Sequence, residues 1–471
     1  MRTRSPRWLA TPLVAAALIG AVAPTALAAP VVVSEADARK SLDVTVYNDN
    51  LALVREVRGV ELPSGTSTLE FRGVPAQIEP RSLLIGEETG VRVIEQNYEF
   101  DLLSREKILE KYVGRDLAWI QEDGRRIPGR LLGMAAGPVF EVDGQVVFDV
   151  PGRLALPALP ENLRARPTLV WLLDAGRGGT VDLEASYLTR GVSWSADYVL
   201  QLDQQGERAG LQAWVSIDNQ CGATFEGARL LLVAGTINQV QPQVRQLSMR
   251  GKEMLAMPDE AGLTEEALYD YHLYTLPGTT MLKDAQIKQL SLFGAADIGV
   301  KRRYRVVAAP FWYQAARVRQ KAEQQVETCL VFQNSQDNGL GIPLPAGVVR
   351  VYGQAKSGAR QLLGEDRLGH TPRDEKIELR LGVAFDLVAE RTQTDYRRVA
   401  DNVHESGFRI ALRNRKEEAV TIEVSERAGG DWRVLESSHP YEKRSATELV
   451  FELPVPAGGE TVLSYRLQVT Y

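Results

Sequence analysis

The stretch TVDLEASYLTRGVSWSADYVLQLD, residues 180–203, contains two runs in which apolar and polar residues alternate. Alternation with a period of two places every second side chain on one face of a β-strand. The same reading applies to the neighbouring stretches TLVWLLD (168–174), LQAWVSID (211–218) and ARLLLVAG (228–235). No helical segments alternate with these strands, so they do not form βαβ units. The pattern predicts a mainly β protein built from antiparallel sandwiches.

Strand patterns also dominate on both sides of this stretch. LDVTVY (42–47), TSTLEF (66–71) and VRVIEQ (91–96) alternate and are separated by turn residues, which predicts an antiparallel β unit over 29–100. From Tyr304 onward, strands resume and continue to VTIEVSER (420–427) and TVLSYRLQVTY (461–471). The region 241–268 has few strand signals, and TEEALYDY, which begins at Thr264, predicts a helix there.

One helix is predicted after the first unit, in LSREKILEKYVG (103–114). Ser104 is a suitable N-cap, with Leu103 and Ile108 positioned as a hydrophobic staple, and Gly114 suits the left-handed C-terminal position. Close turns follow, and Asp143-Gly144 between VFEV and QVVFDV predicts a hairpin. Short strands and tight turns over about 50 residues predict a small barrel, which PALPENLRARP (157–167) links to the next unit.

At 471 residues, the chain is long enough for about three domains. We expect several antiparallel β-sandwich or small-barrel domains in tandem, with few short helices. The expected boundaries are 1–28 for a signal peptide, 29–100 for the first β unit, 101–160 for the helix and small barrel, 161–320 for a sandwich with a partly helical insertion near 241–300, and 321–471 for a C-terminal sandwich.

The first 28 residues have the order of regions found in a secretory signal peptide. Arg2, Arg4 and Arg7 precede an apolar run from Leu9 to about Val22, and small residues then end at Ala28, the expected cleavage site. Cleavage would remove three arginines and no acid from a chain of net charge −6. We therefore expect a periplasmic or secreted acidic protein that does not bind nucleic acid and has no transmembrane segment in its mature part.

The glycine-rich stretch NGLGIPLPAGVVRVYG, residues 338–353, is the nearest approach to a phosphate-binding loop. Such a loop requires glycines between a strand and a helix. Here prolines and then a strand follow, so the stretch predicts a sheet corner that enters a strand with Val349 and Val351 on one face.

Catalytic and metal-binding patterns are weak. His272, His370, His404 and His439 show no metal-ligand spacing, and there is no G-x-S-x-G motif. GEDRLGHTPRDEK (364–376) contains carboxylates, but basic residues nearly balance them, as in a solvated loop. We predict no catalytic residue, no metal site and no cofactor.

Cys221 and Cys329 are the two cysteines of the chain. In an oxidising compartment they could form a disulfide, and the alternative is two unpaired thiols. The sequence leaves both possibilities open.

Several motifs together resemble a known family. They are VYNDNLALVREVRGVEL (46–62), EQNYEFDLLSREKILEKYVGR (95–115), ASYLTRGVSWSADYVLQLD (185–203), DNQCGATFEGARLLLVAG (218–235), YHLYTLPGTT (271–280), NGLGIPLPAGVVRVYG, GEDRLGHTPRDEKIELRLGVAFDLVAERTQTDY (364–396) and VPAGGETVLSYRL (455–467). From about residue 180 to 471 they resemble the domain of unknown function 4139 family, and the first two resemble the leader region of its exported bacterial members. The resemblance implies a mainly β exported protein and assigns no active residues.

Two functions remain as hypotheses. The first is a non-catalytic binding or interaction module of the cell envelope, whose partner is an envelope protein or glycan. Exposed aromatic residues such as Tyr271, Tyr274 and Trp312 are its candidate contacts. The second is a hydrolase acting on envelope polysaccharide or peptide, with His370 and Glu365 or Asp366 as its site.

Overall fold

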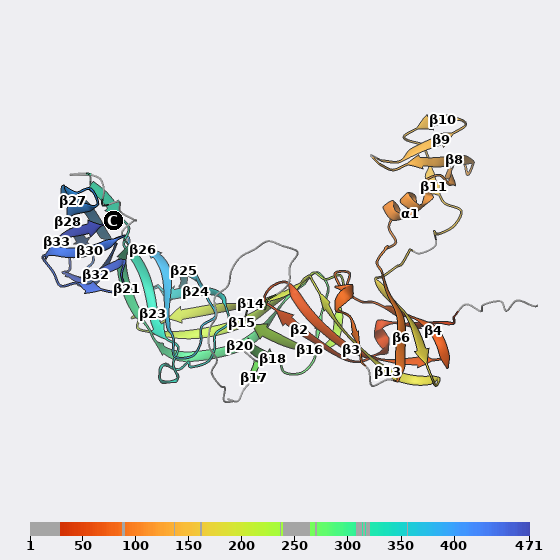
Figure 1. Ribbon diagram of the computed structural model, residues 1–471, viewed down its shortest axis with the longest axis horizontal. Coiled ribbons are helices and arrows are strands. Elements are labelled where there is room, and N and C mark those ends of the chain that lie inside the picture. The colour runs from red at the N-terminus through yellow and green to blue at the C-terminus, as the bar shows by residue number, and fades with distance from the viewer. Residues whose placement is uncertain are drawn as a thin grey trace, which may run out of the picture.

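The structure is a computed structural model. It describes residues 29–86, 90–135, 137–160, 163–235, 237–238, 264–268 (backbone only), 271–307, 313, 316, 321–355 and 357–471. In this part of the chain the protein is mainly β, as predicted, and its one α-helix is α1 (Arg105–Tyr112). The body is elongated, with a small unit projecting from it near one end and the C-terminal strands at the other (Figure 1). The predicted signal peptide, with Ala28, lies outside the described residues.

Two sheets form the N-terminal part of the body. The first has the order β1-β4-β12-β6. Its strands are β1 (Val31–Ser34), β4 (Gly65–Arg72), β12 (Thr168–Ala175) and β6 (Val91–Glu99). The second has the order β17-β18-β16-β2-β3-β13-β5, with β19 (Thr280–Leu282) also paired to β16. Its strands are β17 (Thr264–Leu268), β18 (Tyr271–Thr275), β16 (Phe225–Ala234), β2 (Arg39–Tyr47), β3 (Leu51–Leu62), β13 (Gly179–Thr189) and β5 (Leu84–Ile85).

Both of these sheets combine strands from before and after the projecting unit. β12 pairs with β4 and β6, and β13 pairs with β3 along its whole length. β16 adds to β2 in parallel. The segments 29–100 and 161–320, which we expected to form separate units, therefore share their sheets.

The middle sheet has the order β20-β15-β14-β24-β25. Its strands are β20 (Gln286–Gly299), β15 (Arg208–Asn219), β14 (Val192–Leu202), β24 (Gly347–Gln354) and β25 (Arg360–Leu368). Val349 and Val351 are both buried, in agreement with the prediction that they share one face of the strand that follows the corner. The corner itself contains the short 3-10 helix η4 (Gln336–Asn338), followed by Gly339 in the left-handed region at φ 73°. β24 then pairs in parallel with β14.

Two further sheets form the C-terminal sandwich. One has the order β26-β23-β21-β29-β32-β31, and the other β22-β27-β28-β33-β30. The first contains β26 (Lys376–Val383), β23 (Glu327–Gln333), β21 (Lys301–Val307), β29 (Val420–Arg427), β32 (Glu448–Val455) and β31 (Glu442–Lys443). The second contains β22 (Lys321–Gln324), β27 (Leu387–Ala400), β28 (Val403–Asn414), β33 (Glu460–Thr470) and β30 (Asp431–Ser437).

Among the described residues, the buried apolar side chains form three clusters. The largest runs from Leu42 to Leu379 and draws on the two N-terminal sheets, the middle sheet and strands β23 and β26. A second fills the C-terminal sandwich, from Tyr304 to Val469. The third belongs to the projecting unit and comprises Leu109, Tyr112, Leu117, Trp119, Leu131 and Phe140. The projecting unit therefore has a core of its own.

The projecting unit lies between β6 and β12 in the chain. α1 has the predicted caps, because the Ser104 side chain accepts a hydrogen bond from Lys107 N (3.1 Å) and Gly114 has φ 78°. The five strands are β7 (Asp116–Ile120), β8 (Arg126–Gly133), β9 (Val139–Val142), β10 (Gln145–Val147) and β11 (Arg153–Ala155). Their order is β10-β9-β8-β7-β11, so the sheet is open. The predicted small barrel is wrong, because no ladder among the described residues joins β10 to β11 and closes the sheet.

A second prediction is also wrong. Thr264–Leu268 forms strand β17 rather than a helix. It pairs along its length with β18, with Thr264 opposite Thr275 and Leu268 opposite Tyr271. A sheet edge offers the backbone of this segment hydrogen-bond partners that an isolated helix would have to provide internally, and this pairing outweighs the helix propensity of its glutamates and alanine.

Candidate functional site

Segments that are distant in the sequence meet around His370. The Nδ1 atom of His370 accepts a hydrogen bond from Ala346 N (3.2 Å), and Leu344 and Thr371 exchange two backbone hydrogen bonds (2.8 and 2.9 Å). Tyr274 donates to Pro343 O (3.2 Å), and Tyr198 donates to Pro345 O (2.7 Å). These bonds attach the corner before β24 to β14, to β18 and to the turn after β25.

The groups that influence His370 differ from those expected for a hydrolase. Partial burial lowers the pKa of His370, the electrostatic interaction with His272 lowers it further, and the interaction with Asp49 opposes the shift. Asp366 instead accepts hydrogen bonds from Arg380 N (2.7 Å) and Arg367 N (2.8 Å).

Glu365 forms an ion pair with Arg350 (3.4 Å). Among the described residues, neither acid forms a hydrogen bond or an ion pair with His370. Both acids lie on β25, and the histidine follows the end of that strand. The structure therefore does not assemble the expected hydrolase set.

His404 has a structural role in the packing of aromatic side chains. His404 is buried, its Nδ1 lies 3.0 Å from the Tyr396 hydroxyl, and its ring packs between Tyr396 and Tyr471. Among the described residues, no group of three or more His, Cys, Asp or Glu is arranged to hold a metal ion.

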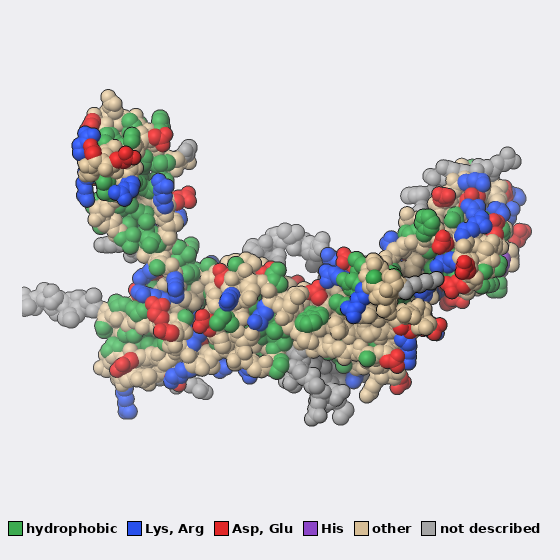
Figure 2. All heavy atoms as spheres, turned by 180° about the vertical axis from the view of Figure 1, so that it is seen from behind, with side chains coloured by type: hydrophobic (Ala, Val, Ile, Leu, Met, Phe, Trp, Pro, Cys, Tyr) green, Lys and Arg blue, Asp and Glu red, His purple; other side chains and the backbone are tan. Residues whose placement is uncertain are grey.

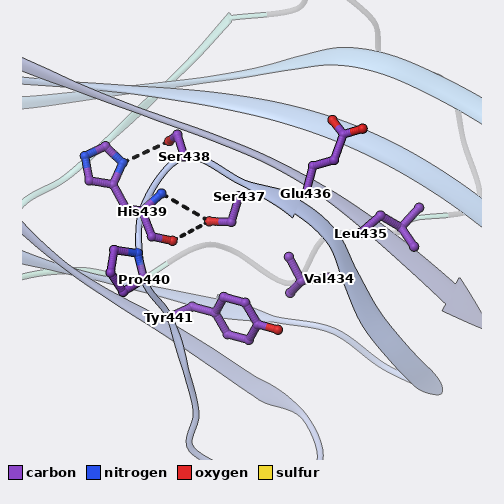
Figure 3. Close-up of a pocket in the computed structure, with 8 residues that line it drawn as sticks. All are labelled: Val434, Leu435, Glu436, Ser437, Ser438, His439, Pro440 and Tyr441. Carbon is purple, nitrogen blue, oxygen red and sulfur yellow. Dashed lines mark hydrogen bonds between the residues drawn. The ribbon is translucent and has the colours of Figure 1, made fainter.

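A shallow pocket surrounds His439 in the turn after β30. It is lined by Val434–Tyr441, a single continuous segment (Figure 3). Ser438 Oγ lies 2.9 Å from His439 Nδ1, a contact that on its own resembles a nucleophile and its base. However, Ser438 Oγ also accepts from Ser464 N (2.8 Å), and the Glu436 carboxylate points away from the ring in Figure 3. These bonds shape the turn and attach it to β33.

The two cysteines are free thiols, and both are buried. The structure thus contains the unpaired alternative rather than the disulfide. Burial raises the pKa of Cys221 to about 12 and also raises the pKa of Cys329. Since the thiolate is the reactive form, neither side chain is suited to nucleophilic chemistry at neutral pH.

The predicted aromatic contacts are not a shared surface. Tyr274 is buried and packs edge-on against Trp194, with ring centroids 6.3 Å apart. Tyr271 is half-buried next to Gly235. Trp312 lies outside the described residues. Tyr274 is therefore a core residue, which alternation along β18 could not distinguish from a surface position.

Exposed apolar side chains instead occur together on the projecting unit. Val146 of β10 is 63% exposed, and Phe148, directly after β10, is 70% exposed. We call this pair the apolar edge. β10 is the outermost strand of the small sheet, at the end of the unit farthest from the body (Figure 1). Hydrophobic side chains also lie among charged ones on the surface of this unit in Figure 2.

Sequence reasoning missed the apolar edge, although QVVFDV contains a signal for it. Val147 pairs with Phe140 and packs on the small core, so the side chains of one face of this strand point inward. Val146 therefore points outward. A strand that is apolar on both faces must expose one of them when its sheet has only one core.

Comparison with known families identifies the chain. A model described as "Domain of unknown function (DUF4139)" matches residues 183–471. The chain belongs to the DUF4139 family. No curated protein matches it. The family match begins within β13, so α1 and β7–β11 precede the part that the DUF4139 model covers. Among the described residues, no helix is long and apolar enough to cross a membrane.

Proposed function

We propose that this DUF4139 protein is exported and acts in the cell envelope as a non-catalytic binding protein, using its projecting unit to contact a partner protein. The observation that carries the proposal is the apolar edge of a unit with its own core, with Val146 largely exposed on the outermost strand and Phe148 largely exposed directly after it. The arrangement of residues 1–28 as a signal peptide supports export.

The energetic argument rests on where these two side chains lie. Single exposed apolar residues are common on protein surfaces and need no explanation. Here a valine and a phenylalanine flank one residue, at the free edge of a projecting sheet. Covering both in an interface would remove apolar surface from water at a gain of about 1.5–3 kcal/mol for each side chain. A contribution of this size is typical of an interface anchor.

The experiment is capture of partners by the mature full-length chain. Crosslinking in the native envelope, followed by affinity purification and mass spectrometry, should recover a reproducible set of proteins. Val146→Ser together with Phe148→Ser should remove this set, while Leu84→Ser, at a position 70% exposed on β5, should retain it. Identical recovery with all three chains would contradict the proposal, as would recovery of a glycan in place of a protein.

A further inference from the structure

The free edge of β10 has unpaired backbone groups. On its inner side β10 pairs antiparallel with β9, with Val146 opposite Glu141 and Val147 opposite Phe140. No described strand pairs with its outer side. Edge strands of this kind can template another strand, and many proteins protect them with lysine or proline. β10 instead has an apolar side chain at its centre.

The charges around this edge are acidic. On the outer face of the sheet, Asp116, Arg130, Glu141 and Val146 form one row across β7, β8, β9 and β10. Arg130 pairs with Asp116 (2.9 Å), the carboxylate one strand further from the edge. Asp143 precedes β10 and Asp149 follows Phe148, and both are exposed. Neither takes part in an ion pair with another described residue.

We propose that the outer edge of β10 binds an extended segment of a partner protein as an added strand, and that this segment alternates apolar and basic residues. The inference rests on the proposed function and names the kind of partner. The added backbone would pair with β10, and apolar side chains would cover the apolar edge. Because alternate residues of a strand share a face, an apolar residue opposite Val146 places the basic residues of the segment on the other face. Three residues to either side of that position, basic residues would lie opposite Asp143 and Asp149.

The exposed carboxylates of Asp143 and Asp149, which we call the acidic rim, also argue against a second copy of this chain as the occupant. Antiparallel pairing of two β10 strands about Val146 would place Asp143 of one copy opposite Asp149 of the other, at both ends of the interface. Like charges directly opposite each other destabilise a strand pair. A basic segment meets the same two carboxylates with attraction, which also accelerates association at low salt.

The length of β10 limits the affinity. The strand has only three residues, so an added strand gains few backbone hydrogen bonds. The apolar edge and the rim must supply most of the binding free energy. We therefore expect a dissociation constant on the order of micromolar for a short peptide, weakening as salt screens the rim.

The test uses the mature full-length chain and three synthetic peptides, read by fluorescence anisotropy. One peptide alternates valine and lysine, the second alternates valine and glutamate, and the third is the first with central prolines that block strand pairing. We expect the valine–lysine peptide to bind and the other two to bind at least about tenfold more weakly. Hydrogen exchange should show new protection confined to β10. Equal binding of all three peptides, or protection elsewhere, would overturn the proposal.

Two variants connect binding to the named residues. Asp143→Asn with Asp149→Asn removes both charges at little change in shape, and asparagine tolerates the positive φ of 50° at position 143. Val146→Ser with Phe148→Ser removes the apolar edge. Each double variant should weaken the valine–lysine peptide about tenfold, and Leu84→Ser should not. Unchanged affinity in both double variants would overturn the proposal. So would a native chain that forms a dimer in solution and becomes a monomer on substitution of Val146 and Phe148 by Ser.

The outcome also separates this inference from the proposed function. If envelope capture depends on Val146 and Phe148 but the three peptides bind with equal affinity, the binding function stands and strand addition is wrong. If capture is indifferent to these residues as well, both are wrong.

Discussion

At the scale of single residues, the protonation of His370 makes the stability of the folded chain depend on pH. Its neutral ring accepts a hydrogen bond from Ala346 N, and a protonated ring has no acceptor. Burial and His272 lower the pKa of His370 in the folded chain. The unfolded chain therefore binds more protons between that lowered value and the ordinary pKa of about 6.5, and the free energy of unfolding decreases as pH falls through this range.

Substitution of His370 by Gln should reduce this acid sensitivity. In the native chain we expect the thermal unfolding temperature to decrease from pH 7.5 to pH 5.5, and we expect a smaller decrease in His370→Gln. Differential scanning calorimetry at both pH values measures the difference. His439→Gln is the matched control, because among the described residues the hydrogen bonds of His439 stay within its own turn. An equal decrease in the native and His370→Gln chains would exclude His370 as the source.

Gly347 is a second position where one residue decides the packing. A Cβ atom at Gly347 would collide with the backbone carbonyl of Ala196 on the parallel partner strand β14. Gly347→Ala should therefore lower the free energy of unfolding by about 1–3 kcal/mol. Gly294→Ala is the control, since its Cβ would lie 3.8 Å from the nearest atom, Leu211 O. Denaturant unfolding of the two variants makes the comparison, and equal stability would refute the clash.

At the scale of elements, α1 is the helix whose ends the sequence defines. Ser104→Ala removes the N-cap hydrogen bond to Lys107 N and should destabilise the helix by about 1 kcal/mol. Ser104→Asp keeps an acceptor and should preserve the stability. Hydrogen exchange of the amides at the start of α1 measures both effects. Unchanged exchange in Ser104→Ala, or equally fast exchange in both variants, would show that the N-cap hydrogen bond does not stabilise the start of the helix.

At the scale of the whole molecule, three separate cores divide the body from the projecting unit. The small core holds Trp119, which is 3% exposed and packs edge-on against Phe140 with ring centroids 4.8 Å apart. Chain segments with separate cores can open independently of one another. The projecting unit should therefore unfold without disrupting the sheets from which it extends.

Trp119→Ala tests this independence. Loss of a buried tryptophan typically costs about 3–5 kcal/mol, which a small core cannot tolerate. We expect hydrogen-exchange protection to be lost across β7–β9 and retained in β3 and β13. Trp171→Ala, in the largest core, should lose protection in β3 and β13 and retain it across β7–β9. Loss of protection in β13 on substitution of Trp119 would mean that the cores are coupled.

Features that depend on neighbouring residues in the chain were predictable from the sequence. The alternation of residues 180–203 predicted the strands β13 and β14, the Ser104 and Gly114 caps predicted the limits of α1, and the prolines after Gly339 predicted a corner rather than a phosphate loop. In each case the backbone preferences and hydrogen bonds lie within a few residues, so local sequence carries the information.

Only the tertiary structure decided which strands share a sheet. The β2–β16 and β14–β24 ladders join segments far apart in the chain, and pairing with β18 makes a strand of Thr264–Leu268. Strand pairing also places Tyr274 in the core and leaves Val146 and Phe148 at an open edge. Glu365 and Asp366 bond to Arg350 and Arg380 on the neighbouring strands rather than to His370. The physical reason is that alternation specifies two faces for a strand, while the neighbours that cover each face come from distant parts of the chain.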